Sequence, residues 1–151
     1  MAETLGSLCD KLTIIKLKQW HSEDKERLMS LENQENQLKD EINNFVYDAL
    51  KGNIPIDKLT FSSNKVYKKE GNNVVDVIGT LGSVFAQLAE VNCKLWHEQE
   101  KVYEFESVPP EEKNKVVKQL ALLNLERNKC MDHIDNEFKQ LISHNITNTK
   151  F

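Results

Sequence analysis

Proline and glycine are scarce in this chain, which has three prolines and five glycines among 151 residues. These residues build most turns, so their scarcity argues against a strand-rich fold, which would need many turns. Long hydrophobic runs are also missing, because no apolar stretch approaches the ~20 residues that cross a membrane. The N-terminal residues MAETLGSLCDKL lack the basic, apolar and small-residue pattern of a secretory signal. We therefore expect a helical protein that neither spans a membrane nor is secreted.

Cysteine is also scarce, and there is no surplus of positive charge. Cys9, Cys93 and Cys130 are odd in number and show no C-x-x-C spacing. This pattern predicts reduced, buried thiols in a cytoplasmic protein, with no disulfide and no metal site. Twenty Lys and Arg residues are interleaved with twenty-four Asp and Glu residues, which gives a net charge of −4. The chain therefore lacks the basic surface that binds nucleic acid or an anionic membrane.

Charged residues make up 29% of the chain and apolar residues 39%, and the apolar residues recur at helical spacing. One helix over 4–51 would be about 70 Å long, so we expect a break near 30–36, where the letters ENQENQ contain no apolar anchor. Pro110 followed by two acidic residues is typical of a helix start. Residues 52–73 then form one long connection, and 143–151 form a frayed polar tail. The expected helices cover 4–30, 36–51, 76–106 and 110–142.

Two stretches of the chain repeat each other. Residues 4–25 read TLGSLCDKLTIIKLKQWHSEDK and residues 80–101 read TLGSVFAQLAEVNCKLWHEQEK, with nine of twenty-two aligned positions identical. Average amino-acid usage would give about one or two identities. Together with the four helices, this internal repeat predicts an all-α, up-down-up-down four-helix bundle built as a duplicated helical hairpin. The bundle would be a single domain over 1–151.

Polar residues interrupt one of the expected apolar seams, the stripes of residues three and four apart that pack into the core. The last helix has the seam Val117, Leu120, Asn124, Arg127, Met131, Ile134, Phe138 and Leu141. The preceding helix has the seam Val77, Leu81, Val84, Leu88, Val91, Leu95, Glu98, Val102 and Phe105. Because these helices run back from a turn near Val108, Asn124 should be level with Asn92. The repeat makes Lys16 the counterpart of Asn92. We thus expect a polar layer of Lys16, Asn92, Asn124 and Arg127, bordered by Trp20 and Trp96.

The polar layer has a structural and a functional interpretation. A seam Asn commonly fixes helix register, and large aromatic residues such as Trp20 and Trp96 commonly fill a bundle. If the layer is only structural, Arg127→Leu should be tolerated, because a packed apolar residue often replaces a buried charge without loss. In the functional interpretation, the layer meets an anionic ligand or partner.

Motifs for catalysis are absent from the sequence. There is no G-x-x-x-x-G-K, G-x-S-x-G or Cys-His arrangement, and no histidine pair has metal-ligand spacing. Acidic pairs at 23–26, 32–35 and 132–135 have the spacing that could hold Mg²⁺ in an all-helical nucleotide pyrophosphohydrolase. They lie off the apolar seams, so we expect them on a solvated face. We predict no catalytic residue, no metal and no cofactor.

Three segments of the sequence resemble a known family: LGSLCDKLTIIKLK (5–18), LAEVNCKLWHEQEKVYEFE (88–106) and LALLNLERNKCMDHID (120–135). The family consists of small, uncharacterised all-helical bacterial proteins encoded near cell-surface polysaccharide and glycosyltransferase genes. The polar positions that the resemblance implies are Asp10, Lys11, Lys16 or Lys18, Asn92, Trp96, Asn124 and Arg127. Gln99 and Glu100 stand where the family has a Glu-Asp pair, and Tyr103 where it usually has Arg. The family has no established reaction, so the resemblance implies a setting and not a mechanism.

The function expected from the sequence is binding. We predict a cytoplasmic, non-enzymatic accessory protein that acts beside glycosyltransferases of surface-polysaccharide assembly and binds a protein partner or forms a homo-oligomer. The alternative is a small helical enzyme or ligand-binding module for an anionic, sugar-nucleotide-like ligand. The candidate ligand-binding residues are Lys16, Trp20, Asn92, Trp96, Asn124 and Arg127. Neither nucleic acid nor a membrane is expected as a partner.

Overall fold

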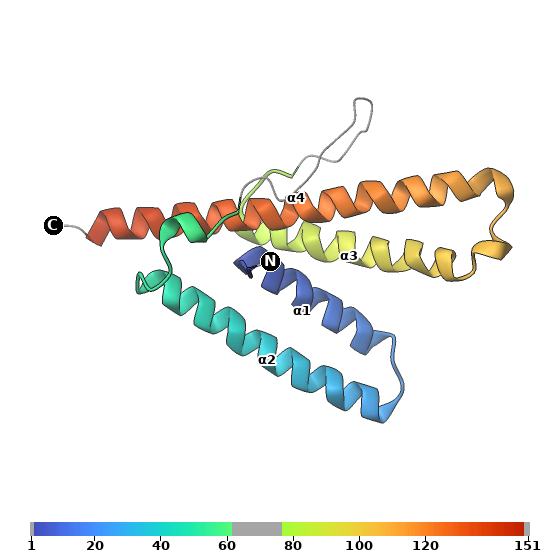
Figure 1. The fold of residues 1–151 in the computed structure, drawn as a ribbon, viewed down its shortest axis with the longest axis horizontal. Helices are drawn as coiled ribbons and strands as arrows, with labels where there is room; N and C mark the ends of the chain where they lie inside the picture. Colours follow the sequence, from blue (N-terminus) through green and yellow to red (C-terminus); the bar gives the residue numbers. More distant parts are fainter. Residues whose placement is uncertain (1, 62–76, 150–151) are drawn as a thin grey trace.

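The computed structural model describes residues 2–61 and 77–149, which form four α-helices (Figure 1). The helices are α1 (Leu5–Trp20), α2 (Lys25–Leu50), α3 (Leu81–Tyr103) and α4 (Pro110–Thr149); the short 3₁₀ helices η1 (Ile56–Lys58) and η2 (Phe105–Ser107) lie in the connections. Helices α1 and α3 run in one direction, and α2 and α4 run in the opposite direction (Figure 1). The expected all-α, up-down-up-down four-helix bundle is confirmed, and the described ranges contain no strand.

The two Thr-Leu-Gly-Ser stretches each begin a helix. At the start of α1, the Thr4 hydroxyl accepts a hydrogen bond from the Ser7 backbone N–H at 3.2 Å, and the Ser7 hydroxyl accepts one from the Thr4 N–H at 2.8 Å. At the start of α3, Thr80 accepts from the Ser83 N–H at 3.4 Å. These bonds satisfy backbone donors that have no partner within the first turn of a helix.

The first helical hairpin turns at a different place from the one predicted. Helix α1 ends at Trp20, and Asp24 caps the start of α2 by accepting from the Glu26 N–H at 3.3 Å. The expected break near 30–36 is wrong, because α2 continues through this polar stretch. Glu35 is buried there, and its carboxylate binds Lys16 of α1 and Lys39 of α2 at 2.6 and 2.9 Å. An ion-paired carboxylate thus takes the place of an apolar anchor between α1 and α2.

The ends of the later elements also differ from the sequence predictions. Helix α4 continues to Thr149, so the predicted frayed tail is wrong for 143–149. The connection after α2 is partly packed, because Leu59, just after η1, is fully buried in the core. The rest of the predicted connection, 62–73, lies outside the described residues. Among the described helices, none is long and apolar enough to cross a bilayer.

The hydrophobic core lies where the first half of α1, the end of α2 and the first half of α3 meet the second half of α4. The buried core residues are Leu5, Cys9, Ala49, Leu59, Val84, Leu88, Cys130, Ile134, Phe138 and Ile142. The predicted seam of α3 is correct through Val84, Leu88 and Val91. The predicted seam of α4 is wrong in its first half and at its end, because Val116 and Leu123 face inward while Val117 and Leu141 are more than half exposed.

The α1–α2 hairpin spreads away from the α3–α4 hairpin toward the turns (Figure 1). Helix α1 packs on α3 and α4, whereas α2 packs mainly on α1 and only slightly on α4. The buried residues of α1 are Leu5, Gly6, Leu8, Cys9, Asp10 and Ile15, so its last turn has none. At the far end, Trp20 is 86% exposed. The first hairpin is therefore held to the second mainly through the N-terminal half of α1.

Candidate functional site

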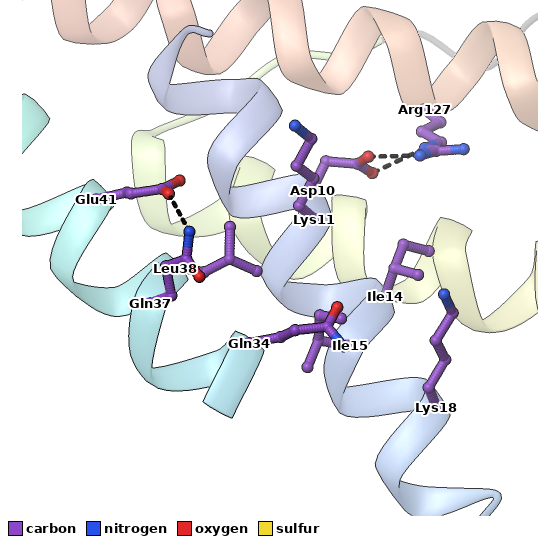
Figure 2. Close-up of a pocket in the computed structure, with 10 residues that line it drawn as sticks. All are labelled: Asp10, Lys11, Ile14, Ile15, Lys18, Gln34, Gln37, Leu38, Glu41 and Arg127. Carbon is purple, nitrogen blue, oxygen red and sulfur yellow. Dashed lines mark hydrogen bonds and ion pairs between the residues drawn. The ribbon is translucent and has the colours of Figure 1, made fainter. Parts of the chain in front are cut away.

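A groove of about 450 Å³ lies along α1, between α2 and α4 (Figure 2). Five of its residues come from α1, four from α2 and one from α4. They are Asp10, Lys11, Ile14, Ile15, Lys18, Gln34, Gln37, Leu38, Glu41 and Arg127. The volume is within the range of ligand-binding clefts, roughly 300–1,000 Å³. Ile14, Ile15 and Leu38 supply its apolar surface, and the other residues supply polar or charged groups.

The groove follows one face of each helix. Four of the five α1 residues stand at positions 11, 14, 15 and 18, and the four α2 residues stand at positions 34, 37, 38 and 41. Both sets have the spacing i, i+3, i+4, i+7, which places side chains in one stripe along a helix. Each stripe covers about 10 Å of helix axis. The groove is thus two helical turns long.

Arg127 is held in place at the groove by Asp10. Its Nε donates to Asp10 Oδ1 at 2.8 Å and its Nη2 donates to Asp10 Oδ2 at 2.5 Å, so the guanidinium and the carboxylate form a two-point pair (Figure 2). Such pairs fix the orientation of the arginine as well as its position. The Asp10 side chain is 5% exposed, whereas the Arg127 side chain is 31% exposed. Hydrogen bonding to Asp10 raises the pKa of Arg127, which stays charged.

Asn92 of α3 supports the same carboxylate from inside the bundle. Its Nδ2 donates to Asp10 Oδ1 at 2.9 Å and to the Thr13 hydroxyl at 2.6 Å. Thr13 in turn donates to the Asp10 backbone oxygen at 2.7 Å. Asn92 is 1% exposed, and its Oδ1 has no hydrogen-bond partner among the described residues. Three helices thus converge on Asp10, and the network holds the Arg127 guanidinium rigidly.

The guanidinium keeps binding capacity in this arrangement. Arginine has five N–H donors, and Asp10 takes two of those of Arg127. The other three have no partner among the described residues. Lys18 lies on the same side of the groove and has no ion-pair partner among the described residues. Ile14 lies between Lys18 and Arg127 (Figure 2). The groove therefore presents two cationic groups with an apolar side chain between them.

The predicted polar layer is only partly assembled. Asn92 and Arg127 meet, but through Asp10, which the layer did not include. Lys16 points away from the layer and binds Glu35, because the spread of the hairpins places this part of α1 against α2. Asn124 is exposed, because α4 is turned by one residue from the predicted seam and Leu123 faces inward instead.

The two tryptophans lie outside the groove. Trp20 is exposed at the end of α1. Trp96 stacks on His21, with ring centroids 4.7 Å apart, and its Nε1 donates to Glu100 at 3.0 Å. The stack joins the turn after α1 to α3. It makes Trp96 a contact between the two hairpins.

A second polar contact between α1 and α4 lies about one turn nearer the start of α1. The Gly6 backbone N–H donates to Asp135 Oδ1 at 2.7 Å, and Asp135 is 6% exposed. Burial raises the pKa of Asp135 to about 6, although its bonds with Gly6 and the Thr4 side chain lower it. The prediction that the pairs 32–35 and 132–135 lie on a solvated face is therefore wrong for Glu35 and Asp135. Among the described residues, no cluster of three His, Cys, Asp or Glu side chains could hold a metal ion.

Several groove residues were missed by reasoning from the seams. Ile14, Gln34 and Leu38 do not belong to the α3 and α4 seams from which the polar layer is predicted. The break predicted near 30–36 falls where α2 borders the groove. Asp10 and Lys18 were named only through the family resemblance. The sequence signal for Lys18 is the stripe 11, 14, 15 and 18, which is basic at both ends and apolar in the middle.

Comparison with protein-family models, curated protein sequences and solved structures finds no match for this chain.

Proposed function

We propose that this protein is a non-enzymatic accessory protein that binds a protein partner in the groove along α1. The observation that supports this most directly is the position of Arg127. A buried carboxylate holds its guanidinium in a fixed orientation, and three N–H donors remain free within the described structure. A donor group that is fixed before binding loses little entropy when it meets an anionic group.

Binding is favoured over catalysis because the buried carboxylate of the groove is already engaged. Asp10 accepts hydrogen bonds from Arg127 and Asn92. A general base must be free to take a proton from its substrate. The other carboxylate of the groove, Glu41, is exposed and bonded to Gln37. These contacts support a groove that holds a partner without transforming it.

A second candidate is a small anionic ligand of the sugar-nucleotide type. The volume of the groove favours it, because about 450 Å³ is sufficient for a molecule of this size. The resemblance in three sequence segments supports a setting beside surface-polysaccharide glycosyltransferases. That setting, and the cytoplasmic location expected from the odd number of cysteines, are part of the proposal.

The proposed function can be tested by filling the groove without disturbing the core. Gln34 is exposed at the groove, and the neighbouring Asn33 is exposed but does not line it. We expect Gln34→Trp to abolish complementation of a strain that lacks the gene, while Asn33→Trp complements fully. Thermal unfolding should show that both variants fold. If a folded Gln34→Trp variant complements as well as the natural protein, the groove is not the functional site.

The small-ligand candidate has a separate test. A ligand that binds only the folded protein at one hundred times its Kd stabilises it by about 2.7 kcal/mol. Thermal unfolding with a nucleoside diphosphate sugar, and with pyrophosphate as the control, would reveal such binding. A rise in melting temperature that Lys18→Glu removes would support this candidate over a protein partner.

A further inference from the structure

We propose that the groove along α1 is the docking site for one amphipathic α-helix of a partner protein, with an apolar stripe and an acidic edge. This inference rests on the proposed function and names the kind of partner that the groove accepts. Three features of the described residues support it: the shape of the groove, the position of its apolar side chains and the distribution of its charges.

The shape of the groove matches a helix. Two stripes with the spacing i, i+3, i+4, i+7 lie side by side, one on α1 and one on α2. Helix α2 packs on α1 but only slightly on α4, so this face of the α1–α2 hairpin is left open along its middle. Helices pack by placing side-chain ridges of one helix in the grooves of another. A third helix lying over this hairpin would complete the same kind of contact.

The apolar side chains favour two turns of a partner helix. Ile14 and Leu38 are partly exposed in the groove, and Ile15 is buried beneath them. Because each stripe covers about 10 Å, it can meet partner residues at i, i+3 or i+4, and i+7. Peptide helices that bind hydrophobic grooves use anchors with this spacing.

The charges on the groove predict the polar edge of the partner. On one side lie three basic groups, those of Lys11, Lys18 and Arg127. Glu3 pairs with Lys11 and Asp10 pairs with Arg127, whereas Lys18 has no ion-pair partner among the described residues. Asp10 is buried and Glu3 neutralises Lys11, so the exposed charge that remains on this side is that of Lys18 and of the Arg127 guanidinium. A partner helix with Glu or Asp along the facing edge would complement it.

Of the groove residues on the opposite side, one is charged, and its charge is negative. Gln34, Gln37 and Glu41 line this side, and Gln37 donates to Glu41 at 3.1 Å. Amide groups can bond either a polar or a basic residue of the partner. The two sides of the groove are therefore unequal, and this inequality fixes the direction in which the acidic edge of the partner faces.

The inference can be tested with two synthetic helices. Both are 18-residue peptides, stapled so that they are helical before binding, with the same leucine stripe. One has a glutamate edge and the other has a lysine edge at the same positions. In fluorescence anisotropy with the purified protein at low salt, we expect the glutamate peptide to bind at least tenfold more tightly than the lysine peptide. Equal affinities, or no binding of the glutamate peptide, would overturn the inference.

A matched pair of charge reversals shows whether binding occurs in the groove. Lys18→Glu should weaken binding of the glutamate peptide at least tenfold. Lys118→Glu makes the same change at an exposed position of α4 outside the groove and should leave the affinity within twofold. An equal loss in both variants would show nonspecific attraction and contradict the inference.

Photo-crosslinking in cells identifies the natural occupant. We expect benzoylphenylalanine at position 34 to crosslink a segment of another protein that is helical, amphipathic and acidic along one edge, while the same group at position 33 does not. A crosslink to a second copy of this chain, to another kind of segment, or to none would overturn the inference. If folded Gln34→Trp fails to complement but the glutamate peptide does not bind, the proposed function stands and only the helical partner is excluded.

Discussion

The backbone N–H of Gly6 donates a hydrogen bond to the carboxylate of Asp135 at 2.7 Å, and this bond joins residues 129 positions apart in the sequence. It brings the backbone of α1 very close to α4: a Cβ atom on Gly6 would lie 2.5 Å from the Met131 carbonyl oxygen. Together with the pair of Asp10 and Arg127, it fixes the position of α1 on the second hairpin.

Replacing Gly6 by Ala is expected to destabilise the protein. The new methyl group would also lie 2.9 Å from Asp135 Oδ1, and the Met131 carbonyl is backbone and cannot move aside easily. Overpacking of this kind costs about 1–3 kcal/mol.

Gly82 provides the matched control, because it holds the corresponding position in the second Thr-Leu-Gly-Ser stretch. Nothing lies within 4 Å of a Cβ atom there. Gly82→Ala should therefore stabilise α3 by about 0.5–1 kcal/mol through the helix preference of Ala. Urea unfolding of both variants checks the pair, and equal effects of the same sign would refute the close approach at Gly6.

Asp135 is expected to make stability depend on pH. Burial raises its pKa to about 6 from the ordinary value of 3.8, so the folded state binds the proton more tightly than the unfolded chain does. Its contribution to stability is therefore full below about pH 4 and is lost as the pH rises through 6. The loss is on the order of 3 kcal/mol.

The Asp135→Asn variant isolates this contribution, because its side chain stays neutral while Oδ1 can still accept from Gly6. Urea midpoints at pH 4.5 and 7.5 should differ less in this variant than in the natural protein. Asp40→Asn, at an exposed position of α2, should keep the natural difference. An unchanged pH dependence in Asp135→Asn would show that Asp135 is not the titrating group.

The substitution Arg127→Leu is now expected to destabilise the protein, contrary to the tolerance expected for a purely structural layer. It would leave the buried Asp10 carboxylate with Asn92 as its remaining side-chain donor. Breaking a buried pair on one side costs about 3–5 kcal/mol. Adding Asp10→Asn removes the uncompensated charge and should recover most of this loss. A double-mutant cycle in urea measures it, and additive effects of the two changes would contradict the coupling.

The three thiols should react at different rates. Cys93 is exposed, whereas Cys9 and Cys130 are buried, and burial raises their pKa values to about 12 and 11. The prediction that all three are buried is therefore wrong for Cys93. A disulfide reagent at pH 8 should label one thiol quickly in the folded protein and all three after unfolding. Cys93→Ser should abolish the fast reaction, and persistence of a fast-reacting thiol would place another cysteine at the surface.

The helical bundle could be predicted because its determinants are local. The starts expected at residues 4 and 110 agree with the structure, and the spacing of Val84, Leu88 and Val91 gives the inner face of α3. The start expected at residue 76 is wrong, because Thr80 caps α3 and the helix begins at Leu81. The turn after Trp20 was missed because it contains neither Gly nor Pro. Its sequence signal was Asp24, which caps the next helix.

The site could be predicted only in part because it depends on long-range pairing. Both Val116 and Val117 are apolar, so the sequence alone does not decide which faces inward, and an error of one residue moves Asn124 to the surface. The sequence predicts that Glu35 faces solvent, because it does not show that Lys16, on another helix, pairs with it. Asn92 and Arg127 are both members of the predicted polar layer, but the carboxylate that joins them is evident only once α1 is placed against α4.

The α1–α2 hairpin is attached to the α3–α4 hairpin near one end, so a small rotation around this attachment moves its other end. Its fixed polar contacts end at Thr13, which accepts from Asn92, and the seven residues from there to Trp20 extend about 10 Å. A rotation of about 10° around this contact would move the far turn by about 2 Å. The stack of His21 on Trp96 opposes such a rotation. Nine of the ten residues that line the groove move with this hairpin, so the rotation would change their distance from Arg127 of α4. A change at Gly6 or at Trp96 would therefore alter the cationic side of the groove without touching any residue that lines it.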